Sequence, residues 1–275
     1  MGWRGYVDTE RKTVFFWSQK AGCTTLFALL ADNITPRPAA KSYFHRNSRF
    51  YPACLPAIRR EGYRSVILVR NPVQRIISAY FNKFCLYRNK PLRCRDDLES
   101  FSRDLHDRYC DLNGITGAAR QDNSMNFEDF LATVADLHAS RGSLRTPVNG
   151  HWDTQCPPQL ARSRWFSYDH VLHLESLDSE LPPLLERLGM VYRPRVANRT
   201  RVAKEPEPGY FGALPGAEVA EHSFGYDNFI TPETLARIEA LYAVDFEVFG
   251  YPRSSPPKET EKGLFGKWQG RLAGR

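Results

Sequence analysis

The sequence predicts a three-layer α/β fold around a central parallel sheet. Strand-like and helix-like segments alternate along most of the chain, which is typical of this fold class. Residues 65–69 (SVILV) are continuously apolar and β-branched, like a strand that helices cover on both faces. A chain of 275 residues, 42% of them hydrophobic, is long enough to bury such a core.

The first half of the chain contains the clearest alternation. Its strands are rich in β-branched and aromatic residues, and prolines or polar residues separate them from the helices. Asn71 suits the cap of a helix and Pro72 suits its first position. The expected elements are strands at 12–18, 42–46 and 65–69 and helices at 24–31 and 72–84.

The second half is less regular. Residues 85–125 are polar and follow no clear period, whereas Thr231 and Pro232 mark the start of the last helix. The expected elements are helices at 126–137, 179–188 and 231–249 and a strand at 171–174. We expect a single domain over 1–252, with a variable helical insertion at about 85–145 and a basic tail at 253–275.

The net charge of +7 indicates an anionic partner. After Tyr251 the tail holds six basic and two acidic residues, so it contributes +4 and leaves +3 for the body. A body with so little excess charge argues against nucleic acid as the partner. The tail also mixes Leu, Phe and Trp with basic residues, which would allow weak contact with an anionic membrane surface.

Features of the whole chain predict a cytoplasmic protein. The N-terminus has no apolar run typical of a signal peptide, and no stretch approaches the ~20 apolar residues that span a bilayer. The six cysteines form no CxxC pair, so we expect free thiols. No metal is expected, because His170 and His173 would point to opposite faces of a strand and the cysteines lack ligand spacing.

The first of two strand–loop–helix segments contains the loop QKAGCTT. A loop that enters a helix presents unpaired N–H groups and the positive end of the helix dipole to an anion. Gly22 allows close approach of the backbone, Lys20 adds a cation, and Thr24 and Thr25 add hydroxyls. The loop is not a Walker A motif, because Lys20 precedes its only glycine.

The second segment, SVILVRNPVQRIISAY, places Arg70 at the end of a strand and Ser78 about two turns into the following helix. In parallel α/β sheets the carboxyl ends of the strands line the ligand crevice. Lys20 and Arg70 both lie at such ends, so we expect them to share one ligand. The ordinary alternatives are a surface salt bridge for Arg70 and a bond to the preceding turn for Ser78.

Together the two segments resemble the sulfotransferases that use 3′-phosphoadenosine 5′-phosphosulfate (PAPS). In that family a lysine loop after the first strand holds the 5′-phosphosulfate, and a strand-end arginine and a helix serine hold the 3′-phosphate. The resemblance implies a P-loop-like PAPS-binding loop. It implies contacts to PAPS from Lys20, Ala21, Gly22, Cys23, Thr24, Thr25, Arg70 and Ser78.

Three further segments resemble the carbohydrate branch, which includes Golgi-type and bacterial enzymes. They are NGHW at 149–152, YDHVLHLESL at 168–177 and LYAVDFEVFGYP at 241–252. The resemblance implies sulfuryl transfer from PAPS to a sugar or polysaccharide hydroxyl, with 3′-phosphoadenosine 5′-phosphate (PAP) as product and no metal. A lipid-linked sugar, a small alcohol and a tyrosyl hydroxyl stay open as acceptors. The Golgi anchor usual in this branch is not found, which favours a bacterial cytosolic enzyme.

Sulfuryl transfer needs a base for the acceptor proton and a cation for the leaving phosphate. Lys20 suits the second role. His45 is the expected base, because in related uronosyl-type enzymes a catalytic histidine lies a couple of dozen residues before the phosphate-binding arginine, and His45 is 25 before Arg70. His151 and Glu175 are the alternative bases.

Other assignments complete the set of alternatives. His151 and Trp152 form a candidate acceptor site, since a Trp ring can stack on a sugar. A thiolate at Cys23 and a basic flap at 198–204 are further possibilities. The alternative functions are a P-loop-like nucleotide or sugar kinase and a non-catalytic polyanion-binding module.

Overall fold

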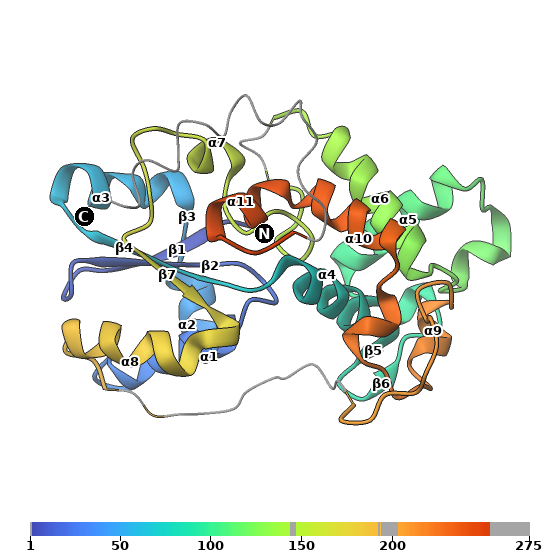
Figure 1. Ribbon diagram of the computed structural model, residues 1–275, viewed down its shortest axis with the longest axis horizontal. Coiled ribbons are helices and arrows are strands. Elements are labelled where there is room, and N and C mark those ends of the chain that lie inside the picture. The colour runs from blue at the N-terminus through green and yellow to red at the C-terminus, as the bar shows by residue number, and fades with distance from the viewer. Residues whose placement is uncertain (1, 144–146, 192, 194–202, 254–275) are drawn as a thin grey trace.

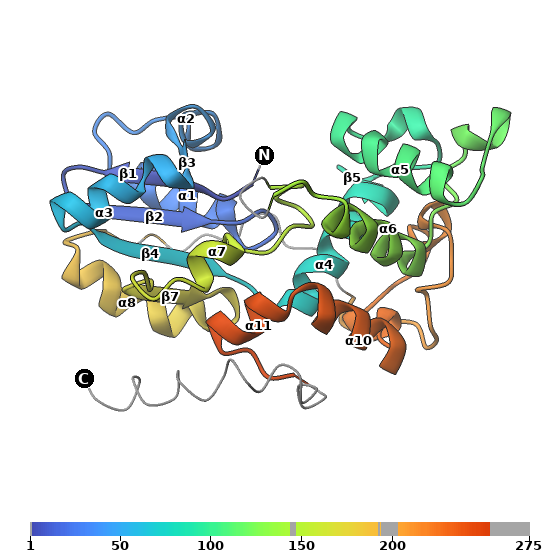
Figure 2. The same cartoon turned by 90° about the horizontal axis from the view of Figure 1, so that it is seen from above.

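A computed structural model describes residues 2–143, 147–191, 193 and 203–253. The molecule has two halves that lie side by side in both views (Figures 1 and 2). One half is a sheet between helices. The other is mainly helical, and helix α4 (Pro72–Tyr80) leads into it from the end of the sheet strand β4 (Arg64–Val69).

The central sheet contains five strands in the order β3–β1–β2–β4–β7. Strands β2, β4 and β7 are parallel, so the expected parallel sheet is confirmed at its centre, whereas β1 pairs antiparallel with β2 and β3. The sequence RGYVD gave no strand signal at β1, and its pairing along β2 stabilises it. The remaining bounds are β1 Arg4–Asp8, β2 Thr13–Trp17, β3 Arg49–Phe50 and β7 His170–His173.

Helices cover both faces of this sheet and make three layers (Figure 1). Side chains alternate along β2, so Phe15 and Trp17 pack in one apolar cluster while Val14 and Phe16 pack in the other. Helices α1 (Cys23–Asp32), α2 (Ala40–Asn47) and α8 (Leu177–Arg187) cover the first face. Helices α3 (Leu55–Glu61), α7 (Pro158–Ala161) and α11 (Ala243–Phe249) cover the second.

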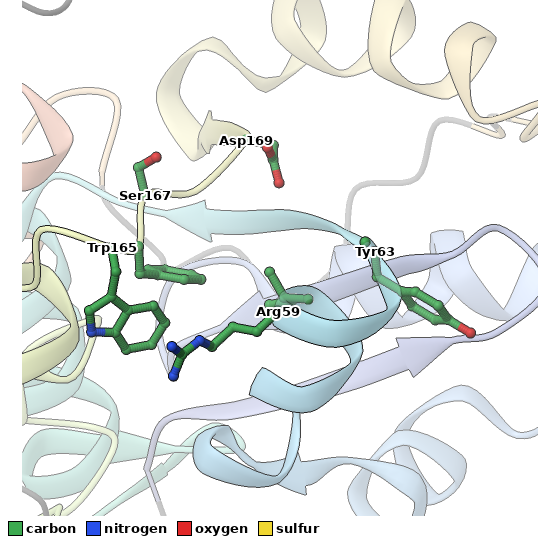
Figure 3. A pocket seen from close by; sticks show the side chains of 8 residues that line it. Arg59, Tyr63, Trp165, Ser167 and Asp169 are labelled. Atoms are coloured by element: carbon green, nitrogen blue, oxygen red, sulfur yellow. The ribbon is translucent and has the colours of Figure 1, made fainter.

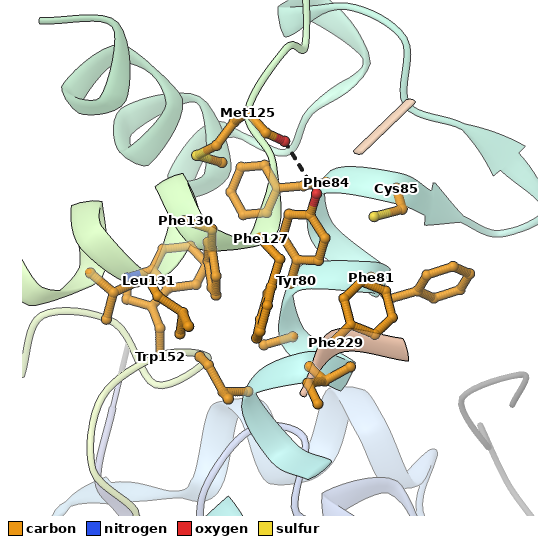
Figure 4. Close-up of a cluster of buried hydrophobic side chains, with 14 of the residues drawn as sticks. Tyr80, Phe81, Phe84, Cys85, Met125, Phe127, Phe130, Leu131, Trp152 and Phe229 are labelled. Carbon is orange, nitrogen blue, oxygen red and sulfur yellow. Dashed lines mark hydrogen bonds between the residues drawn. The ribbon is translucent and has the colours of Figure 1, made fainter. Parts of the chain in front are cut away.

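The helical half has its own aromatic core (Figure 4). Tyr80 of α4 lies at its centre, and its ring contacts those of Phe84, Phe127, Phe130 and Phe229. Its hydroxyl donates to the Met125 carbonyl at 3.2 Å. This half comprises the π-helical turn Phe81–Cys85, β5 Leu86–Tyr87, β6 Lys90–Pro91, α5 Ser100–Leu112, α6 Phe127–Ala139, α9 Gly216–Val219 and α10 Pro232–Leu241. Short 3-10 helices lie at Tyr51–Ala53, Arg95–Asp97, Gly117–Gln121, Leu174–Ser176 and Tyr226–Phe229.

Most expected elements are present, and both expected caps are confirmed. The Asn71 side chain accepts from the Val73 N–H at 3.0 Å, and Thr231 caps α10. The strand expected at 42–46 is wrong, because this segment is helix α2, which packs Phe44 against α1. The helix expected at 231–249 divides into α10 and α11 at Tyr242.

Two predicted features lie largely outside the described residues. They are the basic flap, of which Ala203 and Lys204 alone are described, and the tail, of which Arg253 alone is described. Among the helices that can be described, none has the length and apolar character required to cross a bilayer.

Candidate active site

A cavity of about 1310 Å³ lies at the carboxyl ends of the parallel strands. On the sheet side, the loop after β2, Arg70 after β4 and Glu175 after β7 line it, as expected for an α/β crevice. Residues 81–83, 86–89 and 99–101 of the helical half line it from the other side. The cavity therefore brings together two parts of the chain that fold around separate cores.

The loop between β2 and α1 has an unusual backbone. Lys20 has φ 66° and Gly22 has φ 82°, and Gly22 is the N-cap of α1. The positive φ favours glycine here, and a Cβ atom on Gly22 would lie 2.7 Å from Leu174 Cδ1, so the Leu174 side chain would have to shift to admit another residue. Glycine cannot bond the first N–H groups of α1 with a side chain, and these groups are suited to binding an anion.

The charge state of Lys20 depends on its surroundings. Burial, followed by the positive charges of Lys83 and Arg70, lowers the pKa of Lys20 to about 7. An anion in the cavity would offset these effects and restore the ammonium. The neighbouring Cys23 responds in the opposite direction, because burial raises the pKa of its thiol and disfavours the thiolate.

Arg70 and Ser78 converge on the hydroxyl of Tyr226. One Arg70 guanidinium nitrogen donates to Tyr226 Oη at 2.6 Å, and Ser78 Oγ lies 3.3 Å from the same oxygen. The other guanidinium nitrogen donates to the Lys20 carbonyl at 3.1 Å. Ser78 is fully buried, whereas Arg70 and Tyr226 line the cavity. An oxygen of a ligand phosphate would be recognised by the same donors that now surround Tyr226 Oη.

Both candidate histidines line the cavity, in different settings. His45 is exposed on α2, where its ring meets Phe27 edge-on at 5.9 Å. Burial, then Lys41 and Arg4, lowers the pKa of His45.

His151 is fixed more firmly. Its ring stacks on Phe101 at 4.8 Å with an interplanar angle of 8°, and its Nδ1 lies 2.9 Å from Asn149 Oδ1. Asn149 Oδ1 also accepts from the His151 backbone N–H, so Nδ1 donates and the lone pair remains on Nε2. Burial, followed by Lys83 and Lys20, lowers the pKa of His151 to about 2, which keeps the ring neutral.

Two other predicted residues are committed to structural contacts. The two oxygens of Glu175 accept from the Asn71 N–H at 2.7 Å and from the Tyr251 hydroxyl at 3.0 Å. Trp152 is 2% exposed and packs against Phe84 and Phe130 in the aromatic core. A buried ring cannot stack on a sugar, so the acceptor role expected of Trp152 does not fit this structure.

Sequence reasoning missed the cavity residues of the helical half. Lys83 is 7% exposed, its ammonium pairs with Glu99, and it lies 4.8 Å from the Tyr87 ring centroid and 5.4 Å from that of Phe101. A continuous α-helix was expected at Lys83, whereas the chain forms a π-helical turn there, a feature often found at functional sites. Nothing in the sequence between Ser78 and Lys83, which are five residues apart, predicted this turn.

A second pocket, of about 520 Å³, lies near the opposite ends of the strands (Figure 3). Arg59 lies over the Trp165 ring at 4.3 Å, and Tyr63 and Asp169 precede β4 and β7. Because the ligand crevice of an α/β sheet lies at the carboxyl ends of its strands, this pocket is not the candidate active site.

Comparison with known proteins identifies the family. The model described as the sulfotransferase family matches residues 4–252. The chain belongs to the sulfotransferase family. The resemblance inferred from the lysine loop and the arginine–serine segment is thereby confirmed.

Several curated relatives of this sulfotransferase are carbohydrate sulfotransferases. Carbohydrate sulfotransferase 11 of Mus musculus is 24% identical over 259 residues, which cover 89% of this chain and 66% of the relative. Carbohydrate sulfotransferase 12 of Mus musculus is 25% identical over 72% of this chain and 42% of its own length. Carbohydrate sulfotransferase 14 of Danio rerio is 22% identical over 90% of this chain and 61% of its own length. No solved structure matches the chain significantly.

These relatives correct the expected location. A cytoplasmic sulfotransferase conflicts with the carbohydrate branch, whose members are typically Golgi membrane enzymes, so that expectation is wrong. It rested on the N-terminus, the lack of a bilayer-spanning stretch and the cysteine pattern, which cannot decide the location because the chain spans only 66% of the first relative.

Proposed function

We propose that this sulfotransferase moves the sulfuryl group of PAPS to a carbohydrate hydroxyl by in-line displacement. The observation that carries the proposal is the convergence of the Lys20 loop, Arg70 and His151 on one cavity at the carboxyl ends of β2 and β4. The names of the curated relatives support a sugar as the acceptor.

The residues around the cavity suit a donor with an anion at each end. Lys20 and the start of α1 offer a cation and N–H donors for the 5′-phosphosulfate. Arg70 offers donors for the 3′-phosphate, and the buried Ser78 would take part only where the phosphate displaced Tyr226 Oη, to which its hydroxyl now bonds. The donor supplies the sulfuryl group, whose bond to the 5′-phosphate oxygen breaks as the acceptor oxygen attacks sulfur. Lys20 would donate a hydrogen bond to that phosphate oxygen as its charge develops.

We favour His151 over His45 as the base that takes the acceptor proton. The charges that act on His151 include Lys83, Lys20 and Arg75, whereas those that act on His45 are Lys41 and Arg4. His151 therefore lies in the electrostatic field of the proposed reaction centre. The Nε2 lone pair of His151 is also fixed in direction by Asn149 and Phe101. Anions of a bound donor would raise the low pKa of His151 toward the working range of a base.

An acceptor screen with radiolabelled PAPS tests this function. We expect label to pass to a glycan, and mass spectrometry should place the sulfate ester on a sugar hydroxyl. Calorimetry separates the alternatives, since a P-loop-like kinase would prefer ATP to PAP and a polyanion-binding module would prefer heparin. Tight binding of ATP or heparin alone, without transfer of label, would refute the proposal.

Arg70→Ala should weaken PAP binding by about 10- to 100-fold, because a hydrogen bond to a charged group contributes about 1.5–3 kcal/mol. Adenosine 5′-phosphosulfate lacks the 3′-phosphate, so its affinity should change much less. Calorimetry with both ligands measures the difference.

Arg88→Ala is the matched control, because Arg88 lines the same cavity from the exposed hairpin of the helical half. It should leave the PAP affinity near that of the wild type. Equal losses for PAP and adenosine 5′-phosphosulfate in Arg70→Ala would show that Arg70 does not contact the 3′-phosphate.

A further inference from the structure

Arg75 is a fully buried cation whose three hydrogen bonds join two segments of the active site. Its Nε donates to the Gln19 carbonyl at 3.0 Å, directly before Lys20. Its Nη2 donates to the Gly150 carbonyl at 2.7 Å, directly before His151. Its Nη1 donates to the Asp153 carbonyl at 2.8 Å, on the other side of His151. One rigid guanidinium thus spans the segments that carry Lys20 and His151.

The chemistry of these bonds is unusual for a buried arginine. Its donors bind backbone carbonyls, whereas the carboxylates that balance the charge bind elsewhere: Asp153 accepts from Arg141, and Asp245 accepts from the Gln155 N–H. A buried cation is costly to desolvate, and removing one charge from a buried network leaves its carboxylate and carbonyl partners unsatisfied. The fork geometry of Arg75 holds three carbonyls in fixed positions, in addition to any contribution of its charge to stability.

Neighbouring hydrogen bonds hold the rest of the segment that carries His151. The Gln155 side chain accepts from the Arg70 N–H and donates to the Arg70 carbonyl, both at 2.8 Å. The Tyr242 hydroxyl donates to the Trp152 carbonyl at 2.8 Å. These contacts fix the segment to the end of β4 and to the end of α10. Among the described residues, Arg75 alone binds both carbonyls that directly precede Lys20 and His151.

We propose that Arg75 is a positioning residue that sets the distance between the Lys20 ammonium and the His151 imidazole, so that both reach one sulfuryl transfer at the same time. This inference rests on the proposed function and on His151 as its base. Sub-ångström placement matters here, since a misplacement of about 1 Å can reduce a rate about 100-fold. A lysine at position 75 would keep the charge but could not span three carbonyls in a plane.

Arg75→Lys tests the inference, with Arg141→Lys as its matched control. Arg141 is a largely buried arginine as well: its side chain is 7% exposed, against 0% for Arg75, and it binds the Asp153 side chain. It has no bond to the Lys20 segment among those described. We expect Arg75→Lys to lower kcat by about 10- to 100-fold with the Kd for PAP within about 3-fold of wild type. Arg141→Lys should keep kcat within about 3-fold of wild type, although it should lower Tm by about as much as Arg75→Lys does.

Both variants should be assayed with PAP-binding stoichiometry as the measure of folded enzyme, because PAP stabilises the native state by mass action. Equal kcat values per PAP site in the two variants would overturn the role of Arg75. A second outcome would also overturn it: the Arg75→Lys protein fails to fold even with saturating PAP, whereas Arg141→Lys folds. Arg75 would then be a structural residue. A wild-type protein without sulfuryl transfer would refute the proposed function instead.

Discussion

Lys20→Ala is expected to lower kcat by about 100- to 1000-fold, the range found when one donor to a developing oxyanion is removed. The charge that Lys20 would stabilise appears on the leaving phosphate oxygen in the transition state, so PAP affinity should fall much less than kcat. Steady-state kinetics with a labelled acceptor and calorimetry with PAP measure the two effects separately.

Lys41→Ala is the control for this change. Lys41 lines the same cavity from α2, and its charge acts on His45 but is not among the charges that shift Lys20. Lys41→Ala should keep kcat close to that of the wild type. A Lys20→Ala enzyme with near-wild-type kcat would make Lys20 an ordinary cavity lysine and leave the leaving group without its proposed partner.

The lowered pKa of Lys20 also predicts a pH dependence. Because this pKa is about 7 in the free protein, Lys20 loses its charge as the pH rises through 7. The value of kcat/KM for PAPS should therefore fall above about pH 7, and PAP binding at pH 8 should take up a proton as the anion restores the ammonium. Calorimetry in buffers of different ionisation enthalpy measures this uptake, which should vanish in Lys20→Ala.

His151→Gln is expected to lower kcat by about 10²- to 10⁴-fold, the usual contribution of a general base. Glutamine keeps a polar side chain of similar size but cannot accept the proton. The acid limb in the pH profile of kcat, which reports the base in the enzyme–donor complex, should disappear in this variant. PAP affinity should change little, because the ligand of His151 is the acceptor.

His45→Gln is the matched change at the histidine expected from sequence. It should keep kcat within about 3-fold and retain the acid limb, because its ring is exposed on α2 beside Lys41 and Arg4. A large loss of kcat in His45→Gln, with a small one in His151→Gln, would restore His45 as the base. Losses in both variants that track a loss of PAP-binding sites would indicate damage to the fold and contradict both assignments.

The two loops that suggested the family could be predicted from local sequence. Residues 12–18 and 65–69 have the composition of buried strands, and the polar residues after them lie at the carboxyl ends of β2 and β4 in the structure. Lys20 and Arg70 share a cavity for this reason alone. Helix caps such as Asn71 are equally local, since each bonds an N–H two or three residues away.

Weak local signals account for the elements that were missed or misassigned. The segment 42–46 contains the adjacent aromatic residues Tyr43 and Phe44, which favour a strand, but only Phe44 is buried, on helix α2. Strand β1 has glycine at its second position and charged residues at both ends, so its own sequence does not favour a strand. Pairing with β2 and packing against α1 decide these two segments, and neither contact is visible in a short window of sequence.

By itself the sequence determined the family, the central strands and the positions of Lys20 and Arg70. The tertiary structure decided which side chains accompany them: Tyr226 reaches Arg70 across 156 residues, and the Arg75 Nε reaches Gln19 across 56. It also buried Trp152 while leaving the adjacent His151 at the cavity. The physical reason is that burial and long-range hydrogen bonds depend on how the two halves pack, whereas periodicity reports only on neighbours within a few residues.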